Sequence, residues 1–151
     1  MGNDMHTHLL TADAQRLARA ALWLRLGLGG VWLWSGIVSE FVAPRAVSLG
    51  LLADVGVTGD IAPWLLRAAS LLDVLVGVVT LLGLFTRWVA VAQAAVIVAY
   101  TALLVGHAPS LWAHPFAPIG KNIALVAAAL ALSTTGGGAW SADAWVSRRR
   151  V

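Results

Sequence analysis

The 151-residue sequence contains no cysteine. This absence excludes disulfide bonds, thiol redox catalysis, cysteine-ligated iron–sulfur clusters and cysteine–zinc sites. Charged residues are also scarce, at 11% of the chain, whereas 60% of the residues are hydrophobic. A soluble domain has about a quarter charged residues and about half apolar ones. The composition therefore predicts an integral membrane protein, and a chain of this length leaves no room for a separate soluble catalytic domain.

Four apolar segments are candidates for membrane-spanning helices, which need about 20 mainly apolar residues. They cover residues 18–39, 61–84, 88–106 and 119–135. The last segment is short and polar at both ends, and bilayer thinning or packing against partners would allow it to span. The sequence thus predicts an all-α membrane protein with one domain over residues 1–151. We expect a four-transmembrane-helix bundle and a tail over residues 136–151.

Residues with strong preferences at helix ends mark these segments. Thr11 is a suitable N-cap for the first helix and Asp60 for the second, and the glycines at 136–138 are expected to end the fourth. Pro44 and Gly56 bound a short helix in the first outer loop, which we expect to lie at the membrane interface. The second outer loop, residues 107–118, is rich in proline and is predicted to be a non-helical lid.

Basic residues predict the orientation of the chain in the membrane. Cytoplasmic segments carry an excess of lysine and arginine. Three basic residues fall on one side of a four-span protein and seven on the other, so both termini are predicted to be cytoplasmic. The three are Arg45, Arg67 and Lys121, and the seven are Arg16, Arg19, Arg25, Arg87, Arg148, Arg149 and Arg150. The basic tail is expected to anchor at the interface through anionic lipid.

One carboxylate interrupts the apolar run "RAASLLDVLVGVVTLLGLF" at residues 67–85. Asp73 lies near the expected midplane, where an unpaired charge is costly and is usually paired or functional. Arg25 lies about 7 Å from the centre of the first span at 1.5 Å per residue, and a snorkelling side chain could bring it to Asp73. Such a pair would fix helix register or take part in ligand or proton handling. Alternatively, a neutral Asp73 would hydrogen-bond to Ser70 or Tyr100.

Two polar residues of the third span, Gln93 and Tyr100, are seven positions apart and share a helix face. They are candidates for hydrogen bonds between helices or for the lining of a polar pocket, and hydrogen bonding between helices is the commoner arrangement. Pairs of alanines four apart, such as Ala90 and Ala94, predict close contacts between helices.

A second polar group is expected at the outer end of the bundle. Its members end or begin predicted spans or lie in the outer loop, and they are candidates for one outward-opening pocket. They are Glu40, Arg67, His114, Lys121 and Asn122. The alternative is that each charge meets headgroups or water separately.

Catalytic and metal-binding patterns are not found. No histidine lies inside a predicted span, so neither metal nor haem ligation is predicted. The sequence shows no nucleophile–base pair, phosphate loop or paired carboxylates. We assign no catalytic residue and do not expect catalysis by this chain alone.

Three stretches together resemble the DoxX-like family of small four-span bacterial membrane proteins. They are "LRLGLGGVWLWSGIVSEFVAPRAVSLGLL" (24–52), "GVTGDIAPWLLRAASLLDVLVGVVTLL" (56–82) and "LWAHPFAPIGKNIALVAAALAL" (111–132). The similarity is greatest to a branch also found fused to NAD(P)-dependent epimerase-like domains. The matching positions are Trp34, Ser35, Glu40, Pro44, Asp73, His114, Pro115, Lys121 and Asn122.

The resemblance implies a multi-pass protein of the bacterial inner membrane. The family is named for a subunit of thiosulfate:quinone oxidoreductase, and its members are often associated with membrane redox complexes. An accessory or quinone-proximal subunit is therefore expected, with other membrane subunits as partners, quinone as a possible cofactor and no role for nucleic acid. The alternatives are an independent binder or transporter of a small lipophilic or anionic molecule, and a purely structural assembly subunit.

Overall fold

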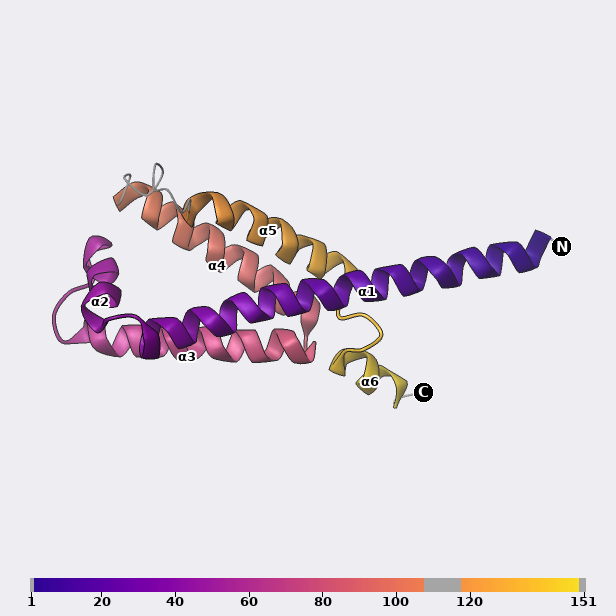
Figure 1. Cartoon of the computed structure of the whole chain (residues 1–151), viewed down its shortest axis with the longest axis horizontal. Helices are drawn as coiled ribbons and strands as arrows, with labels where there is room; N and C mark the ends of the chain where they lie inside the picture. Colours follow the sequence, from indigo (N-terminus) through magenta and orange to yellow (C-terminus); the bar gives the residue numbers. More distant parts are fainter. Residues whose placement is uncertain (1, 108–117, 150–151) are drawn as a thin grey trace.

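The longest element is helix α1 (Gly2–Ile37), which continues into a π-helical turn, η1 (Val38–Val42). The computed structural model describes residues 2–107 and 118–149. At 1.5 Å per residue α1 is about 54 Å long, whereas the hydrocarbon core of a bilayer is about 30 Å thick. Its N-terminal part extends alone beyond the other helices (Figure 1). Thr11 lies inside α1, so its prediction as an N-cap was wrong: no proline breaks the helix before it.

The next four helices in the described part of the chain agree closely with the predicted segments, whereas the last helix, in the tail, was not predicted. α2 lies in the first connection, and α3 and α4 are joined by a turn in which Gly83 is left-handed (φ 69°). Asp60 stands at the N-cap of α3, but its side chain makes no cap hydrogen bond. The elements are α2 (Arg45–Asp54), α3 (Ile61–Leu82), α4 (Thr86–His107), α5 (Pro118–Thr135) and α6 (Ala142–Arg148). Of the lid predicted over residues 107–118, residues 108–117 lie outside the described residues, and its two end residues belong to helices.

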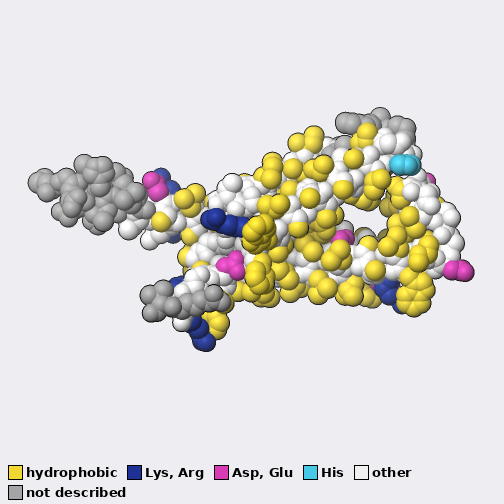
Figure 2. All heavy atoms as spheres, turned by 180° about the vertical axis from the view of Figure 1, so that it is seen from behind, with side chains coloured by type: hydrophobic (Ala, Val, Ile, Leu, Met, Phe, Trp, Pro, Cys, Tyr) yellow, Lys and Arg dark blue, Asp and Glu magenta, His cyan; other side chains and the backbone are white. Residues whose placement is uncertain are grey.

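Within the residues that the structure describes, three helical segments are long and apolar enough to cross a membrane. They are Thr11–Val42, Ile61–Leu82 and Thr86–His107, with mean hydropathies of 1.3, 2.1 and 2.1. Large apolar side chains cover much of the outer surface (Figure 2). The predicted all-α, multi-pass membrane class is confirmed. The crossing of α5, which has 18 residues, stays a prediction.

The helices form two pairs, α1 with α3 and α4 with α5. A core of five buried residues joins α1 to the second pair near the end where α5 stops: Leu28, Ala90, Ala94, Ala129 and Leu132. Burial of Ala90 and Ala94 agrees with the predicted close contact of small residues. Toward the opposite end the two pairs diverge (Figure 1), and Figure 2 shows an opening through the molecule between them.

Glycines allow α1 and α3 to approach each other at backbone distance. A Cβ built on Gly77 would lie 2.6 Å from the Leu33 nitrogen, and one on Gly29 would lie 3.0 Å from the Gly77 oxygen. Gly36 meets the backbone of Ser70 in the same way. The α1–α3 seam therefore depends on residues without side chains, as in other membrane helix pairs.

We expect Gly77→Ala and Gly30→Ala to change stability in opposite directions. At Gly77 the steric cost of overpacking, about 1–3 kcal/mol, exceeds the gain in helix propensity of about 0.5–1 kcal/mol. At Gly30 no atom lies within 4 Å of a built Cβ, so the propensity gain acts alone. Thermal unfolding in detergent, followed by circular dichroism, measures both; equal midpoints would contradict the close packing of α1 on α3.

Candidate functional site

Arg25 is buried, with 3% of its surface exposed, and its guanidinium donates hydrogen bonds to four backbone carbonyls. Nε donates to Thr80 O at 3.1 Å, and Nη1 donates to Gly137 O and Trp140 O, both at 3.0 Å. Nη2 donates to Leu81 O. One side chain thus joins α1, the end of α3 and the segment after α5.

The carbonyls that Arg25 binds explain its position. The last carbonyls of a helix have no partner within the helix and favour a cation nearby. Gly83 leaves the space for it, because a Cβ there would lie 2.6 Å from the Arg25 Cζ. The predicted Arg25–Asp73 pair was wrong: Asp73 is two helical turns, about 10 Å, from Thr80 along α3.

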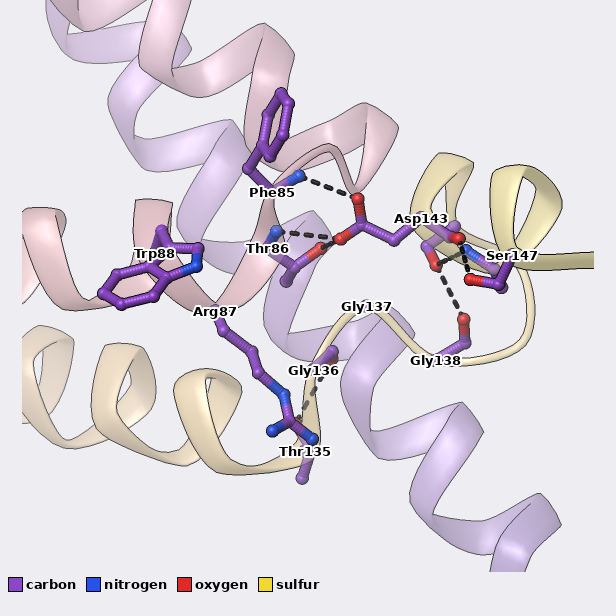
Figure 3. Close-up of a pocket in the computed structure, with 12 residues that line it drawn as sticks. Phe85, Thr86, Arg87, Trp88, Thr135, Gly136, Gly137, Gly138, Asp143 and Ser147 are labelled. Atoms are coloured by element: carbon purple, nitrogen blue, oxygen red, sulfur yellow. Dashed lines mark hydrogen bonds between the residues drawn. The ribbon is translucent and has the colours of Figure 1, made fainter. Parts of the chain in front are cut away.

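Asp143 of α6 caps the N-terminus of α4 from a distant part of the sequence. Its Oδ1 accepts the Phe85 N–H at 2.8 Å, and its Oδ2 accepts the Thr86 N–H and hydroxyl, both at 2.9 Å (Figure 3). The Asp143 charge also acts on Arg25. Ser141 begins α6 by accepting the Ala144 N–H at 3.1 Å. The tail is therefore docked on the α3–α4 turn, a contact that its basic composition did not reveal.

Gln93 extends this polar cluster into α4. It is 1% exposed, and its Nε2 donates to the Thr80 hydroxyl at 2.6 Å, which in turn donates to Val76 O at 2.7 Å. The prediction of a hydrogen bond between helices at Gln93 is confirmed. Its Oε1 has no hydrogen-bond partner among the described residues.

Asp73 lies apart from this cluster, on the side where the helix pairs diverge. Its Oδ2 accepts a hydrogen bond from the exposed Ser35 hydroxyl at 3.0 Å, and its carboxylate is half-buried. Tyr100 of α4 is 49% exposed. Ser70, expected as an alternative partner, is buried and its hydroxyl has no hydrogen bond among the described residues. Oδ1 of Asp73 likewise accepts no hydrogen bond from the described chain.

The residues predicted to form one pocket at the outer end of the bundle have separate partners. Glu40 of η1 pairs with Arg67 of α3 at 3.2 Å, not with Lys121; α1 packs on α3, which brings these two side chains together. The Arg67 guanidinium also lies 5.9 Å from the Trp64 ring centre. Lys121 is exposed and forms no ion pair with a described residue.

Asn122 belongs to the interface between α4 and α5. Its Nδ2 donates to the Thr101 hydroxyl at 2.7 Å, beside a largely apolar groove of about 410 Å³. The groove is lined by Val98, Thr101, Ala102, Val105, Asn122, Ile123 and Val126. His114 lies outside the described residues. Among those described, no cluster of three histidine, aspartate or glutamate side chains could hold a metal ion.

The fold and these contacts define an all-helical, multi-pass membrane protein whose helix pairs are joined at one end. Residues 29–130 match the model of the DoxX-like family. The match covers well over half of the chain, and the protein belongs to this family. Comparisons with curated proteins and with solved structures found no significant match. The matched region contains Ser35 and Asp73, whereas Arg25 and Asp143 lie outside it.

We expect Asp143→Ala to destabilise the protein and Asp60→Ala to do so less. Loss of a helix cap costs about 0.5–2 kcal/mol, and Asp60 occupies an N-cap position without making the cap hydrogen bond. Thermal unfolding gives the magnitude. Hydrogen exchange of the Phe85 and Thr86 amides shows whether the loss of stability arises at the N-terminus of α4. Unchanged protection of these amides in Asp143→Ala would contradict the capping contact.

Proposed function

We propose that this protein is an accessory subunit of a membrane redox complex and that it holds a quinone in the opening between its helix pairs. The observation that carries this proposal is the Asp73 carboxylate, half-buried with one oxygen free of hydrogen bonds from the described chain. An unsatisfied charged group at hydrocarbon depth is costly and points to a partner that the chain does not supply.

The chemistry around Asp73 suits a quinone headgroup. Quinone sites need an apolar slot with few polar contacts, and the divergence of the pairs leaves such a slot (Figure 2). A quinol hydroxyl can donate to the free oxygen of Asp73, and a quinone carbonyl can accept from the hydroxyl of a tyrosine such as Tyr100. Ser35 holds the other carboxylate oxygen at 3.0 Å.

The geometry favours this proposal over an anion binder or transporter. Arg25 is fully engaged by carbonyls, and Arg67 is engaged by Glu40. An anion binder would draw on Arg25, Arg67 and Lys121 for its positive charge, and these contacts leave only Lys121 unpaired among the three. A purely structural subunit remains the alternative, and it differs in what removal of the Asp73 charge would change.

We further propose that α5 crosses the membrane, that both termini face the cytoplasm of a bacterium and that α2 lies at the outer interface. The Arg25 contacts support the even number of crossings, because they bring Leu81 at the end of α3 and Gly137 after α5 to the same end of the bundle. Arg87 lies at that end as well, beside Gly136. The excess of arginine there suits the cytoplasmic side.

Asp73→Asn should weaken binding of a short-chain ubiquinol, the reduced form whose hydroxyl donates to Asp73, about tenfold. This is the loss of about 1.4 kcal/mol, typical of a hydrogen bond to a charged group. Quenching of tryptophan fluorescence in mild detergent measures the affinity, and mass spectrometry of extracted lipids shows whether native quinone copurifies.

Asp54→Asn is the matched control, because Asp54 is exposed at the end of α2; we expect it to bind as the unaltered protein does. Unchanged quinone affinity in Asp73→Asn, together with a lower unfolding temperature or loss of partner subunits, would assign Asp73 a structural role instead. Failure of the unaltered protein to bind or retain quinone would overturn the proposal as a whole.

The topology can be tested with single cysteines, since the chain has none of its own. In spheroplasts, a membrane-impermeant maleimide should label Thr58→Cys and Lys121→Cys, and should label Ser147→Cys only after permeabilisation. Labelling of Lys121→Cys and Ser147→Cys from the same side would show that α5 does not cross.

A further inference from the structure

A pocket of about 340 Å³ lies where the α3–α4 turn meets the tail. This volume is in the range of small-molecule sites, about 300–1,000 Å³. Because the turn connects two spans, the pocket lies at a membrane surface. Its lining comes from the turn, the end of α5 and α6: Phe85, Thr86, Arg87, Trp88, Thr135, Gly136, Gly137, Gly138, Ser141, Asp143, Ala144 and Ser147.

Arg87 supplies the positive charge of this pocket. Its side chain runs toward Thr135 and Gly136 at the end of α5 (Figure 3). A Cβ on Gly136 would lie 3.4 Å from the Arg87 Nε, so the guanidinium lies against bare backbone. Arg87 makes no hydrogen bond or ion pair with any residue that the structure describes, unlike Arg148, which binds two carbonyls of the tail.

Asp143 supplies a negative charge from the other side of the pocket (Figure 3). Its three hydrogen bonds to Phe85 and Thr86 fix the carboxylate in place. Oδ1 accepts one of these bonds, so it retains capacity for another donor. The pocket therefore offers a free cation and a fixed carboxylate.

Two aromatic side chains border the pocket and are mostly exposed, Trp88 at 79% and Phe85 at 71%. Trp88 points away from the turn in Figure 3. Tryptophan is enriched at the level of lipid headgroups, where its ring meets both acyl chain and water. This setting indicates a ligand that has a polar head inside the pocket and an apolar part beside the helices.

We propose that this pocket binds the headgroup of a zwitterionic phospholipid with a primary ammonium group, a phosphoethanolamine lipid. The phosphate lies against Arg87, whose guanidinium matches phosphate oxygens in charge and geometry. The ammonium lies toward Asp143 and donates a hydrogen bond to it. A phosphoglycerol head would bring the phosphate without a cation for Asp143, and a phosphocholine head carries a cation that cannot donate a hydrogen bond.

Native mass spectrometry in mild detergent tests this with added phosphatidylethanolamine, phosphatidylglycerol or phosphatidylcholine. We expect the unaltered protein to retain the ethanolamine lipid at least fivefold more than either other lipid. Arg87→Gln should abolish this preference. Arg19→Gln is the matched control, because Arg19 is an exposed arginine of α1 outside the pocket, and it should retain the preference.

Two outcomes would overturn the proposal: retention of the three lipids in equal amounts by the unaltered protein, or the same preference in Arg87→Gln. Arg87→Gln removes no hydrogen bond of the described chain, so its unfolding temperature should equal that of Arg19→Gln. Free glycerophosphoethanolamine distinguishes the source of the headgroup. Competition by this compound at micromolar concentration would assign the site to a soluble phosphodiester, whereas its failure to compete supports a lipid.

Discussion

The hydrogen bonds from the Arg25 guanidinium to the backbone are the interaction on which the rest of this structure depends. A guanidinium is costly in an apolar interior unless its donors are satisfied, and here four carbonyls satisfy them. These carbonyls lie at the end of α3 and in the segment after α5, where helical N–H partners run out, although Thr80 O also accepts the Gly83 N–H at 3.0 Å. These hydrogen bonds lower the desolvation cost of both the guanidinium and the carbonyls. They can form only where α1, α3 and the tail meet.

This joint at one end explains the opening at the other. The helix pairs are held together around Arg25, Thr80 and Gln93, and beyond that cluster they separate (Figure 1). The exposure of two residues on one face of α4 reflects this separation. Gln93, beside the joint, is 1% exposed, whereas Tyr100, beyond it, is 49% exposed. The common face that the sequence predicts for these two residues leads to common burial only while a neighbouring helix stays beside α4.

Much of the fold follows from the sequence. Apolar length located the three helices that are long and apolar enough to span, and glycine located the end of α5. Partners of individual polar residues were harder to predict. Arg25 binds carbonyls instead of Asp73, and within the predicted outer group Glu40 pairs with Arg67 while Lys121 forms no ion pair with a described residue. Charge and depth suggest attraction between residues, but they do not describe backbone acceptors or which helices pack together.

The Asp143 cap is a further contact whose partner could not be predicted from the sequence. The sequence did not suggest that this acidic residue of the arginine-rich tail caps α4. The N-terminus of α4 lies far from it along the chain. The signal available was its isolation: it is the last of the few acidic residues, in a segment otherwise basic.

Charges that lack a partner distinguish candidate binding sites from the structural framework. Arg25, Glu40, Arg67 and Asp143 are all engaged within the described chain, so their cost is already met. Asp73 keeps a free oxygen where the surroundings are apolar, and Arg87 keeps a free guanidinium at a membrane surface. The two settings favour different ligands. Hydrocarbon depth suits a lipophilic molecule with one or two polar atoms, whereas the surface suits a charged headgroup. The two unpartnered charges therefore support the two proposed ligands, one at hydrocarbon depth and the other at the surface of the same helix bundle.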